Sequence, residues 1–154
     1  MSFARPTRPV DRVFLHCSAS DNPDHDDIDT IRAWHVDGNG WSDVGYHYFI
    51  RKDGTLEAGR ALERTPAAQA GSNAGTLAIC LHGLAAENFT EAQFRTLTRL
   101  AREIDEAYSG RVTFHGHCEV SAKSCPVFPY AEVLGLDDRG RMERPRANDP
   151  AVAA

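Results

Sequence analysis

The stretch TLAICLHGLAAENFTEAQFRTLTRLAREIDEAY, residues 76–108, decides the fold of this chain. It opens with a nearly continuous apolar run at residues 76–81, which is typical of a central strand covered on both faces. Thr90 and Gln93 then have the spacing of a capping box, a signal for the start of a helix. The residues that follow at helical spacing form one apolar face: Phe94, Leu97, Ala101, Ile104 and Tyr108. A buried strand followed by a long amphipathic helix indicates an α/β domain.

Weaker patterns on both sides of this stretch extend the same interpretation. Two further segments are rich in β-branched and aromatic residues, and an Asp-Gly dipeptide after the second predicts a tight turn. The expected strands are residues 10–15, 45–51, 55–58, 76–81 and 111–114, the other expected helix is residues 27–36, and residues 115–129 are an expected loop. Strands separated by helices predict a single α/β domain with a central mixed β-sheet flanked by helices.

The length of 154 residues suits one domain, which we place at residues 10–136. Residues 1–9 form an N-terminal extension. Residues 137–154 are charged and then rich in alanine and proline, so they are expected to form a polar, disordered tail. The connection at residues 59–75 is long and has little apolar periodicity, which is typical of a functional loop.

Charge and hydropathy exclude several classes of partner. The formal net charge is −5, and a dedicated nucleic-acid binder would show a basic surplus instead. No apolar run approaches the roughly 20 residues of a membrane span, so no membrane anchor is expected. The first residues also lack the apolar core of a secretory signal peptide. These features predict accumulation in the cytoplasm.

Three side chains at strand ends could hold a metal ion. His16 follows the first expected strand, and His117 and Cys125 lie in the loop after the last one. Sites in open α/β sheets gather at such strand ends. Two imidazoles and a thiolate suit zinc, and three protein ligands leave a fourth position open, as in catalytic sites. The spacing matches no standard zinc motif, so an ordinary packing role stays open for each of the three.

Four segments of the chain carry a resemblance to a known family. They are FLHCSAS (residues 14–20), IRAWHVDGNGWSDVGYHYFIRKDGTLEAGR (31–60), GTLAICLHG (75–83) and HCEVSAKSCPVF (117–128). They resemble the zinc-dependent N-acetylmuramoyl-L-alanine amidases, that is, the phage-lysozyme amidases related to the peptidoglycan recognition proteins. The similarity covers about residues 10–130, in order and at compatible spacings. It implies the phage-lysozyme and peptidoglycan-recognition-protein fold.

Carried over position by position, the resemblance implies that His16, His117 and Cys125 bind Zn²⁺. Tyr46 and Lys123 match the catalytic tyrosine and lysine of the family. A tyrosine phenol and a lysine ammonium can both stabilise the oxyanion that forms during amide hydrolysis.

Other residues near these motifs are less clearly placed. His117 is preferred over His115 as the ligand, because it keeps the family's distance to the cysteine. Glu119 is a carboxylate near the motif, for which a surface or supporting role is the more ordinary explanation. The triplet at residues 68–70, Ala-Gln-Ala, departs from the family, which often has a histidine there. That difference bears on substrate preference more than on chemistry.

The resemblance implies a monomeric phage or prophage endolysin. It would cut the amide bond between N-acetylmuramic acid and L-alanine in bacterial peptidoglycan, reaching the wall in the periplasm after membrane permeabilisation. One alternative is a non-catalytic peptidoglycan-binding module, although such members lack the cysteine ligand that is present here. Others are a cytoplasmic amidase for recycled wall fragments and a cysteine hydrolase that uses Cys118 or Cys125 beside His115 or His117. No residue pattern supports or excludes a regulatory role toward a partner such as an RNA polymerase.

Overall fold

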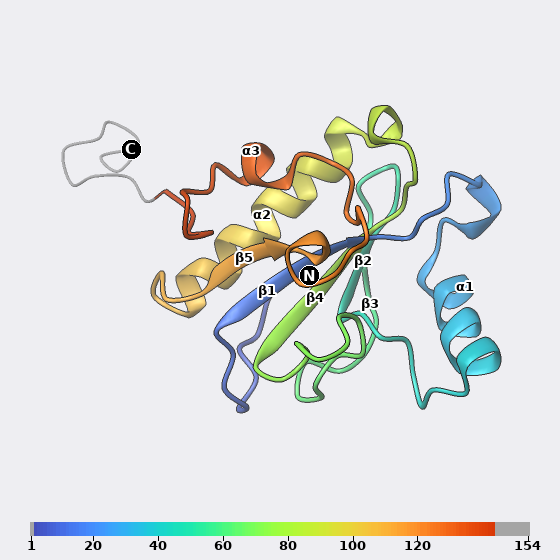
Figure 1. The fold of residues 1–154 in the computed structure, drawn as a ribbon, viewed down its shortest axis with the longest axis horizontal. Coiled ribbons are helices and arrows are strands. Elements are labelled where there is room, and N and C mark those ends of the chain that lie inside the picture. The colour runs from blue at the N-terminus through green and yellow to red at the C-terminus, as the bar shows by residue number, and fades with distance from the viewer. Residues whose placement is uncertain (1, 144–154) are drawn as a thin grey trace.

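The computed structural model describes residues 2–143, which form a five-stranded sheet with helices on both faces (Figure 1). The strand order is β3-β2-β4-β1-β5. The strands are β1 (Arg12–Cys17), β2 (Tyr48–Ile50), β3 (Leu56–Ala58), β4 (Thr76–Leu81) and β5 (Thr113–Gly116). β1 runs parallel to β4 and β5, β2 runs parallel to β4, and β3 is antiparallel to β2. The mixed sheet confirms the α/β class expected from the sequence.

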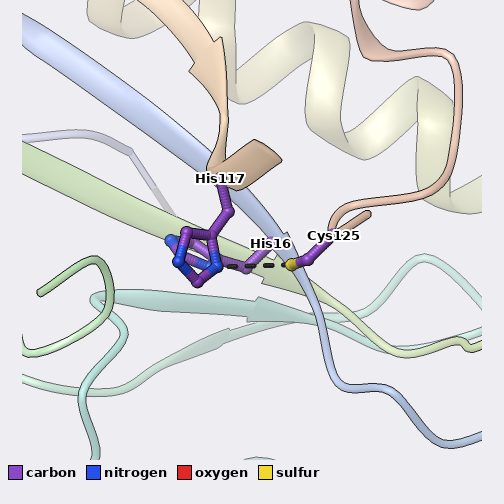
Figure 2. Close-up of side chains that lie close together, drawn as sticks. All are labelled: His16, His117 and Cys125. Atoms are coloured by element: carbon purple, nitrogen blue, oxygen red, sulfur yellow. Dashed lines mark hydrogen bonds between the residues drawn. The ribbon is translucent and has the colours of Figure 1, made fainter. Parts of the chain in front are cut away.

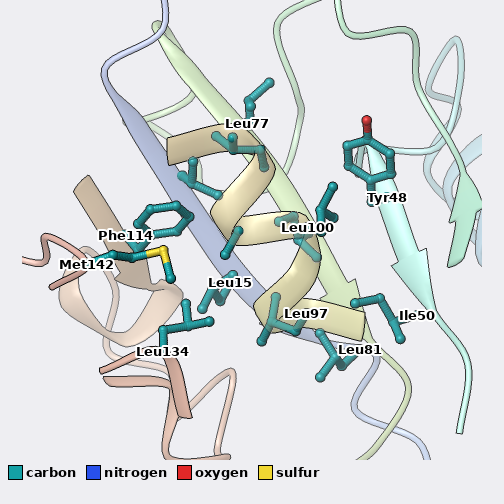
Figure 3. Packing of buried hydrophobic residues seen from close by; sticks show 14 of the residues in the cluster. Leu15, Tyr48, Ile50, Leu77, Leu81, Leu97, Leu100, Phe114, Leu134 and Met142 are labelled. Atoms are coloured by element: carbon teal, nitrogen blue, oxygen red, sulfur yellow. The ribbon is translucent and has the colours of Figure 1, made fainter. Parts of the chain in front are cut away.

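The long helix α2 (Glu91–Ala107) covers one face of this sheet. Its capping box is formed as predicted: the Gln93 N–H donates to Thr90 Oγ1 at 3.1 Å, and Gln93 Oε1 accepts from the Thr90 N–H at 3.0 Å. Leu97, Leu100 and Ile104 turn toward the sheet and are fully buried, and Figure 3 shows the first two among the strand side chains. Each such burial contributes about 1.5–3 kcal/mol.

The opposite face of the sheet carries a smaller apolar cluster beneath α1 (Ile28–Ala33). Ile28 and Ile31 pack there against Val44, Phe49 and Cys80. Phe49 and Cys80 alternate along their strands with residues of the α2-side core, so their side chains point to the other face. His16 on β1 shares this second face, because it too alternates with core residues of the α2 side.

Several elements differ from the sequence-based expectation. The expected helix at residues 27–36 is α1 followed by a wider helical turn, Trp34–Gly38. The expected strand at residues 45–51 is regular only as the shorter β2. A short helix, α3 (Tyr130–Leu134), was not predicted. No helix in the described part of the chain is long and apolar enough to cross a membrane.

The tail packs against the domain as far as it is described, which corrects the expected loose tail from residue 137. The Phe114 N–H donates to the Gly140 carbonyl at 2.7 Å, and Met142 is buried in the main core. A tight turn makes this possible, because the Asp137 carboxylate accepts hydrogen bonds from two backbone N–H groups of the turn. The rest of the expected tail, residues 144–154, lies outside the described residues.

The N-terminal extension also contacts the domain. The Arg8 guanidinium donates to the backbone carbonyls of Leu62 at 2.7 Å and Thr76 at 2.8 Å. Phe3 packs against the α2-side core. These contacts tie the start of the chain to the sheet and to the loop that follows β3.

Candidate metal centre

The carboxyl ends of β1 and β5 bring the candidate ligands to one edge of the sheet. His16 lies near the end of β1, and His117 opens the short helical turn that follows β5. Because β1 and β5 are parallel neighbours, the chain leaves both strands at the same edge. Cys125 lies farther along the loop, where its Sγ accepts a hydrogen bond from the Cys17 backbone N–H at 3.2 Å. That contact holds Cys125 beside His16.

The three side chains converge on one point, as Figure 2 shows. One ligand atom from each of His16, His117 and Cys125 lies within 4.8 Å of the others. The His16 Nδ1 is 3.9 Å from the Cys125 Sγ, and the two imidazole centroids are 4.7 Å apart. In the described part of the chain, this is the one such group of three histidine, cysteine or acidic residues. Its donor set fits a zinc ion with an open fourth position.

Burial prepares both imidazoles to act as ligands. It lowers the pKa of His16 to about 3, and His16 is only 1% exposed. Burial and the nearby Lys123 ammonium lower the pKa of His117 as well. Both rings are therefore neutral at neutral pH, the form that offers a nitrogen lone pair to a metal.

The cysteine differs from the histidines because it must lose a proton to act as a ligand. A hydrogen bond with the Cys17 side chain, together with burial, raises the pKa of Cys125. A coordinating cation reverses that preference and deprotonates a thiol. The backbone N–H of Cys17, which points at the Sγ, supports the resulting negative charge.

Tyr46, the tyrosine that the resemblance implies is catalytic, lies beside the metal group. Its ring centroid is 5.1 Å from that of His16 and 5.5 Å from that of His35. Burial raises the pKa of Tyr46 well above its ordinary value, so the phenol keeps its proton and can donate a hydrogen bond.

Lys123 lines a groove that reaches two members of the metal group, His117 and Cys125. The groove consists of two hollows of about 370 and 300 Å³ that share five lining residues: Trp41, Ala67, Ala68, His117 and Lys123. The smaller hollow also contacts Tyr46 and Cys125. The Lys123 side chain is exposed, so its ammonium is free to meet a ligand in the groove. Tyr46, Lys123, His117 and Cys125 thus line one groove, and His16 is buried beside Tyr46 and His117.

Sequence reasoning gave no role in the site to two residues, the buried Gln69 and the groove-lining His35. Gln69 is fully buried, and its Oε1 lies 2.9 Å from the Nε2 of His16. His35 lines the smaller hollow, and its Nδ1 accepts the Gly45 N–H at 2.8 Å. The sequence singled out the loop at residues 59–75 and the Ala-Gln-Ala triplet within it, but the triplet was connected with substrate preference and not with His16.

The neighbouring residues His115, Glu119 and Cys118 form a separate cluster. The Nδ1 of His115 is 2.8 Å from Glu119 Oε1, and Glu119 Oε2 accepts from the Tyr130 hydroxyl at 2.6 Å and the Gly116 N–H at 2.8 Å. The Cys118 Sγ lies 3.8 Å from that same hydroxyl. Glu119 therefore has a structural role, because its hydrogen bonds connect the turn after β5 to α3.

The sequence profile of one family, N-acetylmuramoyl-L-alanine amidase, matches residues 6–128. The chain therefore belongs to the N-acetylmuramoyl-L-alanine amidase family. Among curated relatives, it is 38% identical over 123 residues to an endolysin of Klebsiella phage KP32, covering 76% of this chain and 80% of the relative. It is also 38% identical over 125 residues to an endolysin of Escherichia phage T7, covering 77% and 82%.

Solved structures agree with this assignment. The endolysin N-acetylmuramoyl-L-alanine amidase LysCS from Clostridium intestinale superposes with a TM-score of 0.74 at 29% identity, covering 83% of each chain. The Drosophila peptidoglycan recognition protein SD has a TM-score of 0.68 at 22% identity, covering 79% of this chain and 76% of that one. At that identity, the second comparison supports the fold alone.

Proposed function

We propose that this protein is an endolysin that hydrolyses the amide bond between N-acetylmuramic acid and L-alanine in bacterial peptidoglycan. It would use a zinc ion held by His16, His117 and Cys125. The observation that carries the proposal is the convergence of these three side chains within 4.8 Å at the groove of a chain that belongs to the amidase family.

In this mechanism, three side chains hold the metal ion and two others stabilise the charge that forms during hydrolysis. A zinc ion with three protein ligands and an open position supplies Lewis acidity and activates water at neutral pH. His16 and His117 contribute neutral nitrogen ligands, and Cys125 contributes a thiolate that partly neutralises the ion. Both hollows of the groove reach His117, and the smaller one also reaches Cys125, so a substrate bound in the groove can meet this centre.

Tyr46 and Lys123 are the proposed catalytic residues. As the scissile carbonyl becomes tetrahedral, its oxygen gains negative charge. The Tyr46 phenol can donate a hydrogen bond to that oxygen, and the Lys123 ammonium can add a positive charge beside it. One such donor is worth about 2.7–4 kcal/mol of the activation barrier.

We also propose how the protein reaches its substrate. It would accumulate in the cytoplasm as a monomer and meet the wall once the membrane has been permeabilised. Peptidoglycan is then its partner, through both glycan strand and stem peptide, and nucleic acid is not. An amidase for recycled wall fragments is the second candidate, because it would require the same site chemistry.

The test is digestion of purified peptidoglycan sacculi, with the products identified by mass spectrometry. We expect free stem peptides that begin with L-alanine, produced by the wild type and not by Cys125→Ser. Cys118→Ser is the matched control, because Cys118 lies on the same loop but outside the metal group, and it should cleave as the wild type does. Binding without any cleavage would leave a recognition module. Cleavage by a chelated protein that is lost in either cysteine variant would indicate a cysteine hydrolase instead.

A further inference from the structure

Gln69 joins the metal group to the loop that follows β3. It is fully buried, although glutamine is a polar residue, and it lies on the loop at residues 59–75. Its Oε1 is 2.9 Å from the His16 Nε2, and its amide nitrogen is 2.8 Å from Thr76 Oγ1 and 3.3 Å from the Ser72 carbonyl oxygen. Every polar atom of the Gln69 side chain therefore has a partner.

The partners of Gln69 fix which way its amide points. The Ser72 carbonyl can only accept a hydrogen bond, so the amide nitrogen must face it. Thr76 Oγ1 donates to the Asn73 carbonyl at 2.8 Å, which leaves it free to accept from the same nitrogen. The Oε1 must then face His16.

The orientation of Gln69 in turn fixes the tautomer of His16. Because Gln69 Oε1 is an acceptor, the neutral ring of His16 carries its proton on Nε2. Its Nδ1 is left as a lone pair, and that is the atom that faces the Cys125 Sγ. Outer partners of this kind hold metal-binding histidines in the right tautomer and orientation.

We infer that Gln69 is a positioning residue of the metal centre. It holds His16 with Nδ1 aimed at the metal, and it transmits the conformation of the loop at residues 59–75 to the ligand. The inference rests on the proposed zinc site, and it adds to the three ligands a hydrogen-bonded chain that runs from His16 through Gln69 and Thr76 to the Asn73 carbonyl. A change in the conformation of the loop that lines the groove would therefore change the affinity of the site for metal.

Two variants separate positioning from simple packing. Gln69→Leu keeps the approximate size of the side chain and removes the acceptor, so zinc affinity should fall about 10–100-fold. Gln69→Glu keeps an acceptor toward His16 but sets a carboxylate oxygen against the Ser72 carbonyl. We expect it to retain zinc affinity at or above that of the wild type while its melting temperature falls.

A second buried glutamine provides the matched control. Gln93 is also fully buried, and its amide nitrogen donates to the carbonyls of Ile50 and His82. Gln93→Leu should lower the melting temperature and leave zinc affinity unchanged. Affinity is measured by competition with a chromogenic chelator, using the full-length protein and zinc alone.

Long-range ¹H–¹⁵N NMR spectra of the zinc-free protein report the tautomer of His16 directly. The wild type should show the proton on Nε2, and Gln69→Leu should shift the population toward Nδ1–H. A wild-type ring protonated on Nδ1 would overturn the inference, as would unchanged zinc affinity in Gln69→Leu. A wild type that takes up no zinc would defeat the proposed function instead, while the NMR measurement would still decide the role of Gln69.

Discussion

Acidification should destabilise this fold through one buried histidine that is not a metal ligand, His47. It is 1% exposed, and its Nδ1 accepts the Ala78 N–H at 3.1 Å while its Nε2 donates to the Arg64 carbonyl at 2.8 Å. The Arg8 guanidinium lies 3.3 Å from the same Nε2. Protonation would place a hydrogen on Nδ1 against a backbone donor, so the folded state resists it.

The direction and size of the effect follow from the pKa values. Burial lowers the pKa of His47 from 6.5 to about 4 in the folded protein. As the pH falls, the unfolded chain therefore binds the proton first. The stabilising contribution of a neutral His47 is complete only above pH 6.5. This contribution is lost progressively as the pH falls from 6.5 to about 4. At 1.36 kcal/mol per pH unit, the full loss is about 3 kcal/mol.

The assay is urea unfolding of the wild type and of His47→Gln, a substitution that keeps an amide but cannot titrate. Between about pH 7 and about pH 4.5, the wild type should lose about 2 kcal/mol more of its free energy of unfolding than the variant. The remaining histidines are common to both proteins, so the difference isolates His47. Equal losses in the two proteins would mean that the folded state does not lower the pKa of His47.

Three other substitutions test the role of Lys123, the packing of the core under α2 and the capping box of α2. Lys123→Met should lower kcat on peptidoglycan about 100-fold or more with unchanged zinc content, because in the proposed mechanism the exposed ammonium stabilises the oxyanion and does not bind the metal. A changed KM with full kcat would contradict that role. Leu100→Ala should lower the free energy of unfolding by about 2–5 kcal/mol in urea titrations, because it opens a cavity under α2; a loss near zero would mean that α2 does not hold the core. Thr90→Ala should cost about 0.5–2 kcal/mol in the same assay, toward the upper end because Thr90 Oγ1 also donates to the Lys52 carbonyl; no loss would argue against the capping box.

The fold was predictable where a residue pattern is long and one-sided. The apolar run of β4 and the capped, amphipathic α2 occur where the periodicity placed them. The short helix α3 escaped prediction because its sequence, YAEVL, is too short to show a helical period. Packing decides such elements: α3 contacts α2 and β5, and neither contact can be seen in the local sequence.

The candidate site was predictable to a different degree. His16 and His117 could be singled out because they follow expected strands. The preference for His117 over His115, and the roles of Tyr46 and Lys123, depended on the family resemblance. The contact of Gln69 with His16 joins residues 53 positions apart through an irregular loop. No periodicity constrains such a loop, so this contact could only come from the structure. Met142 likewise reaches the core through a turn that composition alone did not reveal.

In the proposed mechanism, peptidoglycan cleavage depends on a metal ion held by His16, His117 and Cys125. A zinc titration of chelated, full-length protein tests this dependence, with bound zinc and lysis of sacculi followed in the same samples. We expect activity to be absent without metal and to rise in proportion to bound zinc until one ion is held per chain. Full activity in the metal-free protein, or a bound zinc ion that Cys125→Ser retains with wild-type affinity, would contradict it.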